Sequence, residues 1–182
     1  LLIVFVFLIP ALTMRSFAEE RKQGTDELLL TAPLTPGQLV AGKYLGLLAI
    51  ASMLVVAAAF YVAVLLQYGD PEKGPIGTGL LGLALAVAAL TSLGFAVSTV
   101  TKSQVVAGVS AFVVFLMLFV VDWPAESTEG WVRSLLKALS LPAHFEGFAK
   151  GNVSSVDVAY FVSLAALGLF IARTAIASQR WR

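Results

Sequence analysis

The sequence predicts an all-α fold in which several helices cross a lipid bilayer. Hydrophobic residues make up 59% of the 182 residues and charged residues 13%, whereas soluble domains are about 45–50% apolar and about 25% charged. Beyond the N-terminal region, four long apolar runs carry no charge at their centres, a pattern typical of membrane-spanning helices. We therefore expect a polytopic helix bundle that forms a single transmembrane domain over residues 1–182.

The N-terminal apolar run is too short to cross a bilayer by itself. Residues 1–12 would rise about 18 Å as a helix, and a hydrocarbon core is about 30 Å thick. The run has neither an initiator Met nor the basic start of a signal peptide. We therefore expect residues 1–22 to be the end of an N-terminally truncated membrane helix and its extension into the cytoplasm.

The four longer apolar runs predict membrane helices at 36–66, 76–100, 105–121 and 156–177. Small residues recur four positions apart within them, a spacing that lets helix backbones approach closely in lipid. The pairs are Gly42 with Gly46, Gly82 with Ala86, Gly94 with Ser98, and Gly168 with Ala172. The spacing predicts a packed bundle without identifying which helices meet.

Residues 123–155 differ from the other segments because they mix aromatic and polar residues. Trp131, Leu135 and Leu139 fall on one helical face, and Arg133 and Lys137 fall on the other. Such an amphipathic segment is expected to lie in the membrane interface or to re-enter the membrane from the extracytoplasmic side.

The distribution of basic residues predicts the orientation of the bundle. Alternating crossings would place eight of the twelve Lys and Arg residues on the side of the polar loop within residues 14–46. Because cytoplasmic loops carry the excess of Lys and Arg, we expect that loop and the C-terminus to be cytoplasmic.

The polar loop carries signals for a short helix between two long ones. Gly24 can end the first helix in the left-handed conformation, and Thr25 can cap a helix over 25–32 with Glu27 in its first turn. Thr35 and Gln38 then have the spacing of a capping box. The alternative is an irregular charged loop.

The polar residues predict no catalytic site, bound cofactor or metal in this chain. Gly37, Gly42 and Lys43 have P-loop spacing, but Tyr44 follows where the motif needs Ser or Thr. We expect Lys43 to anchor the helix end at the headgroups. The single histidine, His144, has no cysteine and few acids near it and is expected to face solvent. Basic residues form no stripe that would bind nucleic acid.

Energy for transport is not expected to come from ion coupling. Ionisable residues within membrane helices usually mark ion pathways, and none lies at the centre of a predicted span. This disfavours an ion-coupled carrier and makes the charged cytoplasmic loop the expected point of energy input.

Two stretches resemble ABC-2 type transporter permeases. PALTMRSFAEERKQGTDELLLTAPLTPGQLVAGKYLG is similar to the second and third membrane helices of that family, most of all in its gliding-motility-associated and nitrous-oxide-reductase-maturation group. LPAHFEGFAKGNVSSVDVAYF is similar to the segment that leads into the last helix of the same group. The chain departs from the family pattern in lacking the first membrane helix.

This resemblance implies a type V-like half-transporter in a bacterial cytoplasmic (inner) membrane. It implies a dimer with a second permease chain, identical or not, and two ABC ATPase subunits that bind ATP and Mg²⁺. The helix at 25–32 would be the coupling helix that contacts the ATPase. The residues expected at that contact are Glu19, Glu20, Arg21, Gly24, Thr25, Glu27 and Leu28. The implied function is ATP-driven export of an unidentified substrate; the alternative is a membrane anchor that transmits force without a translocated substrate.

Overall fold

A computed structural model describes residues 2–24, 34–69, 72–126 and 129–179, and within these ranges the regular secondary structure is entirely helical. This confirms the expected all-α fold. The helices are α1 (Leu2–Thr13), α2 (Arg15–Gln23), α4 (Pro36–Tyr68), α5 (Lys73–Val100), α6 (Gln104–Val120), α7 (Asp122–Glu126), α8 (Trp131–Leu139), α9 (Leu141–Ala149) and α10 (Ser155–Gln179).

Four helices of the described chain are long and apolar enough to cross a membrane. They are Pro36–Tyr68, Gly74–Val100, Gln104–Pro124 and Ser155–Gln179, and they occupy the four runs in which the sequence predicts spans. Helix α4 has 33 residues, which corresponds to about 50 Å. It therefore exceeds a bilayer core by several turns and must extend beyond it.

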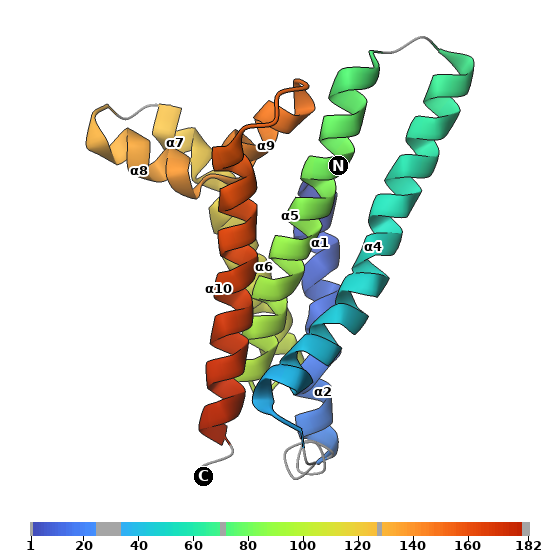
Figure 1. The fold of residues 1–182 in the computed structure, drawn as a ribbon. Helices are drawn as coiled ribbons and strands as arrows, with labels where there is room; N and C mark the ends of the chain where they lie inside the picture. Colours follow the sequence, from blue (N-terminus) through green and yellow to red (C-terminus); the bar gives the residue numbers. More distant parts are fainter. Residues whose placement is uncertain (1, 25–33, 70–71, 127–128, 180–182) are drawn as a thin grey trace.

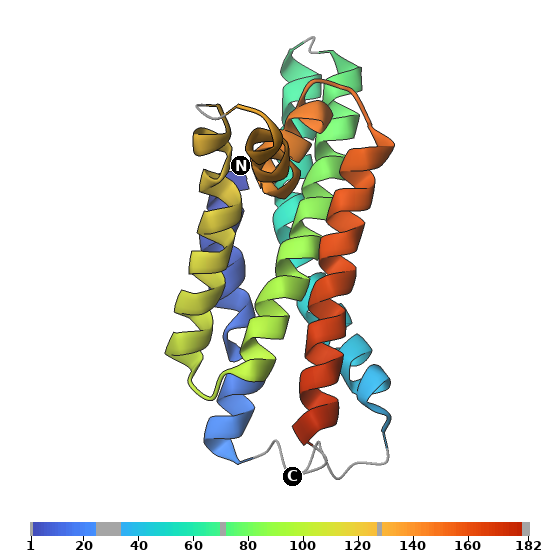
Figure 2. The same ribbon diagram turned by 90° about the vertical axis from the view of Figure 1, so that its left-hand side faces the viewer.

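Helix α5 is the central element of the bundle. It contacts α1, α2, α4, α6, α9 and α10, and Figure 1 shows it between α4 and α10, while Figure 2 shows the same bundle from the side. Helix α2, the beginning of α4 and the end of α10 lie at the lower end of Figure 1. Helices α7–α9 lie near the other end and run across the bundle axis.

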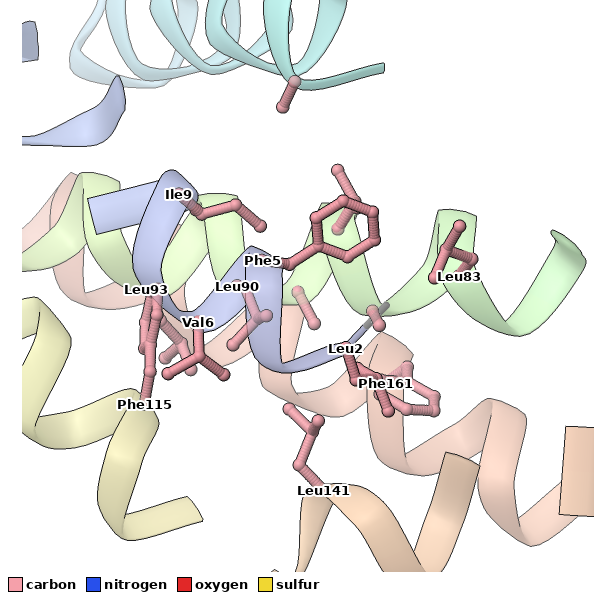
Figure 3. Packing of buried hydrophobic residues seen from close by; sticks show 14 of the residues in the cluster. Leu2, Phe5, Val6, Ile9, Leu83, Leu90, Leu93, Phe115, Leu141 and Phe161 are labelled. Carbon is pink, nitrogen blue, oxygen red and sulfur yellow. The ribbon is translucent and has the colours of Figure 1, made fainter. Parts of the chain in front are cut away.

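Two groups of buried side chains hold the bundle together. The larger one joins α1 to the helices around it and includes Val6, Leu90, Phe115 and Phe161, which are almost fully buried (Figure 3). The second lies at the end of the bundle that carries α2. Its buried members are Phe17, Leu39, Val40, Tyr44, Phe95, Ala96, Ala172 and Ile176.

The predicted close approach of helices is present at some small residues. A Cβ added to Gly94 would lie 3.0 Å from Cβ of Thr13, so α1 and α5 meet closely there. One added to Gly82 would lie 2.6 Å from the ring of Phe148, which α9 inserts against α5. Both glycines are needed because a side chain would occupy space already filled by the neighbouring helix.

At Gly42 and Gly46 the described chain shows no close approach of another helix. A Cβ at either position would meet nothing within 4 Å, because that face of α4 lies on the outside of the bundle. Gly168 of α10 is the opposite case. A Cβ there would lie 2.6 Å from the backbone carbonyl carbon of Ser92 in α5.

The prediction that His144 faces solvent is wrong. Its Nδ1 lies 2.7 Å from Oδ1 of Asp157, and its side chain is 14% exposed. The imidazole also stacks on the ring of Tyr160, with the ring centroids 4.0 Å apart. Helix α9 folds back against the first turns of α10, a tertiary contact that spacing along the sequence does not reveal.

Helix α8 keeps its apolar face exposed. Trp131, Leu135 and Leu139 are about half exposed or more, and the residues of α8 contribute nothing to the buried core. In contrast, Leu141 and Phe148 of α9 are fully buried. The segment therefore joins the bundle through α9 and presents α8 away from it.

We expect Gly168→Ala to destabilise the protein by about 1–3 kcal/mol, the usual cost of overpacking, because the new methyl group would meet the backbone of α5. Gly46→Ala is the matched control, since nothing lies near that position and alanine favours a helix. Thermal unfolding in detergent measures both variants. Equal melting temperatures for the two would contradict the close packing of α10 on α5.

Candidate functional site

The candidate site is the elbow formed by the α1–α2 junction, the first turns of α4 and the end of α5. The sequence predicts one continuous helix through Lys22, but the structure divides it at Met14. Thr13 contributes to the break because its hydroxyl donates to the carbonyl of Ile9 at 2.9 Å. Such bonds to the preceding turn bend helices.

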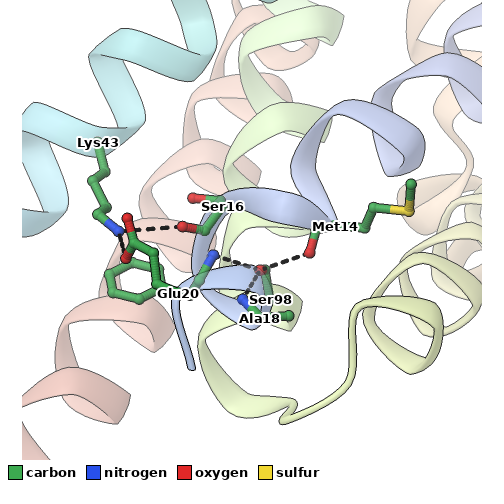
Figure 4. Close-up of polar contacts among 7 residues, drawn as sticks. Met14, Ser16, Ala18, Glu20, Lys43 and Ser98 are labelled. Atoms are coloured by element: carbon green, nitrogen blue, oxygen red, sulfur yellow. Dashed lines mark hydrogen bonds and ion pairs between the residues drawn. The ribbon is translucent and has the colours of Figure 1, made fainter. Parts of the chain in front are cut away.

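Ser98 of α5 satisfies the backbone groups at this break. Its hydroxyl accepts hydrogen bonds from the N–H groups of Phe17 at 3.1 Å and Ala18 at 3.4 Å, and it donates to the carbonyl of Met14 at 3.4 Å (Figure 4). Ser98 is fully buried. Because water does not reach these groups, the serine replaces bonds that a continuous helix would have made within itself.

Lys43 joins α4 to α2. Its Nζ pairs with the carboxylate of Glu20 and donates to the carbonyl of Ser16 at 3.2 Å (Figure 4). The same nitrogen lies 3.7 Å from the ring centroid of Phe17, within the range of a cation–π contact. The expected role of Lys43 as a headgroup anchor is therefore wrong, because its charge is used inside the elbow.

Apolar packing supports these polar contacts. Phe17 and Phe95 place their ring centroids 5.6 Å apart, so α2 is held against α5 by an aromatic pair as well as by Ser98. Tyr44 is buried in the same cluster, and its hydroxyl donates to the carbonyl of Ala88 at 3.1 Å. Within the elbow, α2 and the beginning of α4 are thus both held against α5.

The beginning of α4 has the predicted capping box. The Thr35 side chain accepts from the N–H of Gln38 at 3.3 Å, and the Gln38 side chain accepts from the N–H of Thr35 at 2.9 Å. This confirms the helix start that the sequence predicts. It also places Gly37, Gly42 and Lys43 in one continuous helix, which is not the geometry of a phosphate-binding loop.

Some residues expected at the partner contact lie in this elbow. Glu20 is on α2 and faces Lys43. Glu19 and Arg21 belong to the same helix, and their side chains are outside the described structure. Gly24 follows with φ 69°, which confirms the left-handed conformation expected after the helix.

Thr25, Glu27 and Leu28, and with them the expected helix at 25–32, lie outside the described residues. The capping by Thr25 therefore stays a prediction.

Sequence reasoning missed Ser98, Phe95 and the pairing of Lys43. Ser98 was identified only as a small residue spaced from Gly94, and its hydrogen-bonding role depends on a break in a helix far away in sequence. Lys43 carried a weak signal, because a lone cation within an apolar run needs either a headgroup or an acidic partner. Which of these it finds is decided by where α2 lies.

The elbow is suited to mechanical coupling. In the described part of the chain, no group of three or more His, Cys, Asp or Glu side chains could hold a metal ion. What the geometry does provide is a set of contacts that joins α2 to both α4 and α5 at the point where residues 25–33 connect two helices.

Comparison with known proteins places these features in a family context. A family model described as ABC-2 family transporter protein matches residues 1–128. The inner membrane transport permeases YhhJ of Escherichia coli strain K12 and Shigella flexneri are each 28% identical to the chain over 166 residues. These alignments cover 86% of the chain and 44% of each relative. The chain therefore spans less than half the length of these curated relatives.

We expect Ser98→Ala to destabilise the protein by about 1–3 kcal/mol, because buried N–H and carbonyl groups at the helix break would lose their partner. Ser52→Ala is the control, since the exposed Ser52 hydroxyl donates to the carbonyl of Ala49 in its own helix. Hydrogen exchange at the Phe17 and Ala18 amides should accelerate in the first variant alone. Unchanged exchange at both amides would contradict the role assigned to Ser98.

Proposed function

The chain belongs to the ABC-2 family of transporter proteins, and we propose that it is part of a permease that moves its substrate with energy from ATP hydrolysis by a partner subunit. The observation that carries this proposal is the double attachment of α2, to α5 through Ser98 and to α4 through Lys43. A force applied next to α2 would then reach two membrane helices at once.

The ATPase is proposed to contact the segment that begins on α2 and ends before α4. Glu19, Arg21, Gly24, Thr25, Glu27 and Leu28 are the proposed contact residues, with ATP and Mg²⁺ bound by the ATPase. Glu20 has a different part in this mechanism. Because its carboxylate pairs with Lys43, it passes the movement of α2 on to α4 in addition to any contact with the partner.

Movement of the elbow is proposed to tilt α4 and α5 together as rigid bodies, the usual form of such a switch. The capping box fixes the beginning of α4, and the Tyr44 hydroxyl ties its next turns to α5. Movement at residues 25–33 would therefore not be lost by fraying of the helix end.

The remaining features of the proposed assembly are proposed from the resemblance to the family. We place the elbow and the C-terminus in the cytoplasm of a bacterium, with a second permease chain completing a dimer and export as the direction of transport. Within the family, we propose that the chain belongs to the gliding-motility-associated and nitrous-oxide-reductase-maturation group. Its support is the sequence of the elbow and of the segment that leads into α10.

The second candidate function is force transmission without a translocated substrate. It is favoured by the same elbow, which couples α2 to the bundle whether or not a cargo passes. Substrate-stimulated ATPase activity in reconstituted vesicles distinguishes the two functions, because only a transporter couples cargo binding to hydrolysis.

We expect the combined charge reversal Glu19→Lys and Arg21→Glu to weaken binding of the ATPase to the full-length permease about tenfold, or about 1.4 kcal/mol. Opposed charges at a contact would become like charges. The control is Glu146→Lys on α9 with Lys150→Glu directly after it, which reverses an ion pair of 2.5 Å at the far end of the bundle. Undiminished ATPase affinity and transport would exclude α2 as the contact.

We expect Lys43→Glu or Glu20→Lys alone to lower the transport achieved per ATP hydrolysed, because like charges would then separate α2 from α4. The double variant should recover at least half of the loss, since the ion pair is restored in reverse. Transport and hydrolysis are measured together in vesicles. If the double variant is as impaired as the sum of the single variants, the pair does not link the two helices.

A further inference from the structure

A groove of about 520 Å³ lies between α4 and α10. It is lined by Val40, Ala41 and Leu45 from α4 and by Ala166, Leu169 and Phe170 from α10. The two helices run in opposite directions (Figure 1), so the start of α4 and the last turns of α10 share one end of the groove. Its volume is within the range of small-molecule sites.

Arg173 gives this apolar groove its only charged side chain. It is exposed, and among the side chains that the structure describes, no Asp or Glu forms an ion pair with it. Tyr44 also lines the groove, and its hydroxyl already donates to the carbonyl of Ala88. The groove therefore has an apolar length and one cationic end without a protein partner in the described chain.

We propose that this groove binds an anionic phospholipid, with an acyl chain along α4 and α10 and the headgroup phosphate on Arg173. The guanidinium group suits phosphate because it donates paired, charge-assisted hydrogen bonds. Arg173 lies six residues before the end of α10 at Gln179, about 9 Å along the helix. A side chain at that depth reaches the headgroup region while its stem covers apolar surface.

Charge argues against a second copy of the chain as the occupant. A symmetric dimer buries the same patch of each subunit, so two Arg173 side chains would enter one interface. The residues that line the groove include no acidic group to pair with them. A zwitterionic lipid would fill the apolar length equally well but would gain less at Arg173, which is why the proposal specifies an anionic headgroup.

The full-length protein in nanodiscs of equal parts phosphatidylglycerol and phosphatidylcholine tests this site. After transfer to detergent, the retained lipids are counted by native mass spectrometry. We expect Arg173→Gln to lower the retained ratio of phosphatidylglycerol to phosphatidylcholine about fivefold, the contribution of one basic residue. Arg173→Lys should keep most of the preference. The control is Arg133→Gln, which removes an exposed arginine of α8 that lies outside the groove.

A second variant tests the apolar part of the groove with the charge intact. Ala41 and Ala166 are exposed, so Ala41→Phe with Ala166→Phe fills the groove without disturbing the core, as an unchanged melting temperature would verify. Retention of phosphatidylglycerol should fall at least as far as in Arg173→Gln.

Three outcomes would overturn the proposal. One is an unaltered lipid ratio in Arg173→Gln, and another is an equal fall in Arg133→Gln. The third uses full-length protein in which Ala41→Cys is the only cysteine; the 182 residues themselves contain none. If Ala41→Cys forms a disulfide between two copies, or is shielded from a thiol reagent in lipid-free detergent by another segment of the full-length protein, the groove has a protein occupant. None of these measurements depends on the ATPase, so they test the lipid site separately from the proposed function.

Discussion

The structure depends on one constraint: a membrane bundle must satisfy every backbone group that it buries. At the α1–α2 junction this requirement falls on Ser98, whose single hydroxyl serves three backbone groups of another helix. The bend that results turns α2 out of line with α1. It also brings Phe17 onto Phe95, so the hydrogen bonds from Ser98 and the apolar packing occur at the same place.

The position of α2 in turn determines the chemistry of Lys43. An ammonium group in an apolar helix needs an acidic partner or a headgroup, and here Glu20, the Ser16 carbonyl and the Phe17 ring together provide its surroundings. These contacts cross between α2 and α4, on either side of residues 25–33. The main effect of this ion pair is geometric, because it fixes the position of α2 relative to α4. The two helices therefore move together.

At the opposite end of the molecule, apolar packing and a polar contact again occur together, here between α9 and its neighbours. Helix α9 inserts Phe148 against Gly82, and His144 bonds to Asp157 while its ring stacks on Tyr160. Helix α8 contributes no buried side chain to this packing and keeps Trp131 exposed; its last residue, Leu139, accepts a hydrogen bond from the Tyr160 hydroxyl through its carbonyl. The segment over 123–155 thus combines a docked helix with an amphipathic one, a division that its periodicity alone did not reveal.

The sequence by itself determined the helical class, the four long apolar helices, the capping box at Thr35 and the left-handed Gly24, because these depend on composition and on residues within a few positions of one another. It also contained the features that identify the family. Only the tertiary structure decided the break at Met14, the partner of Lys43, the burial of His144 and which glycines pack. Each of these depends on residues distant in sequence: Gly168 and Gly46 have similar local surroundings, yet α5 lies against one and nothing within the bundle lies against the other.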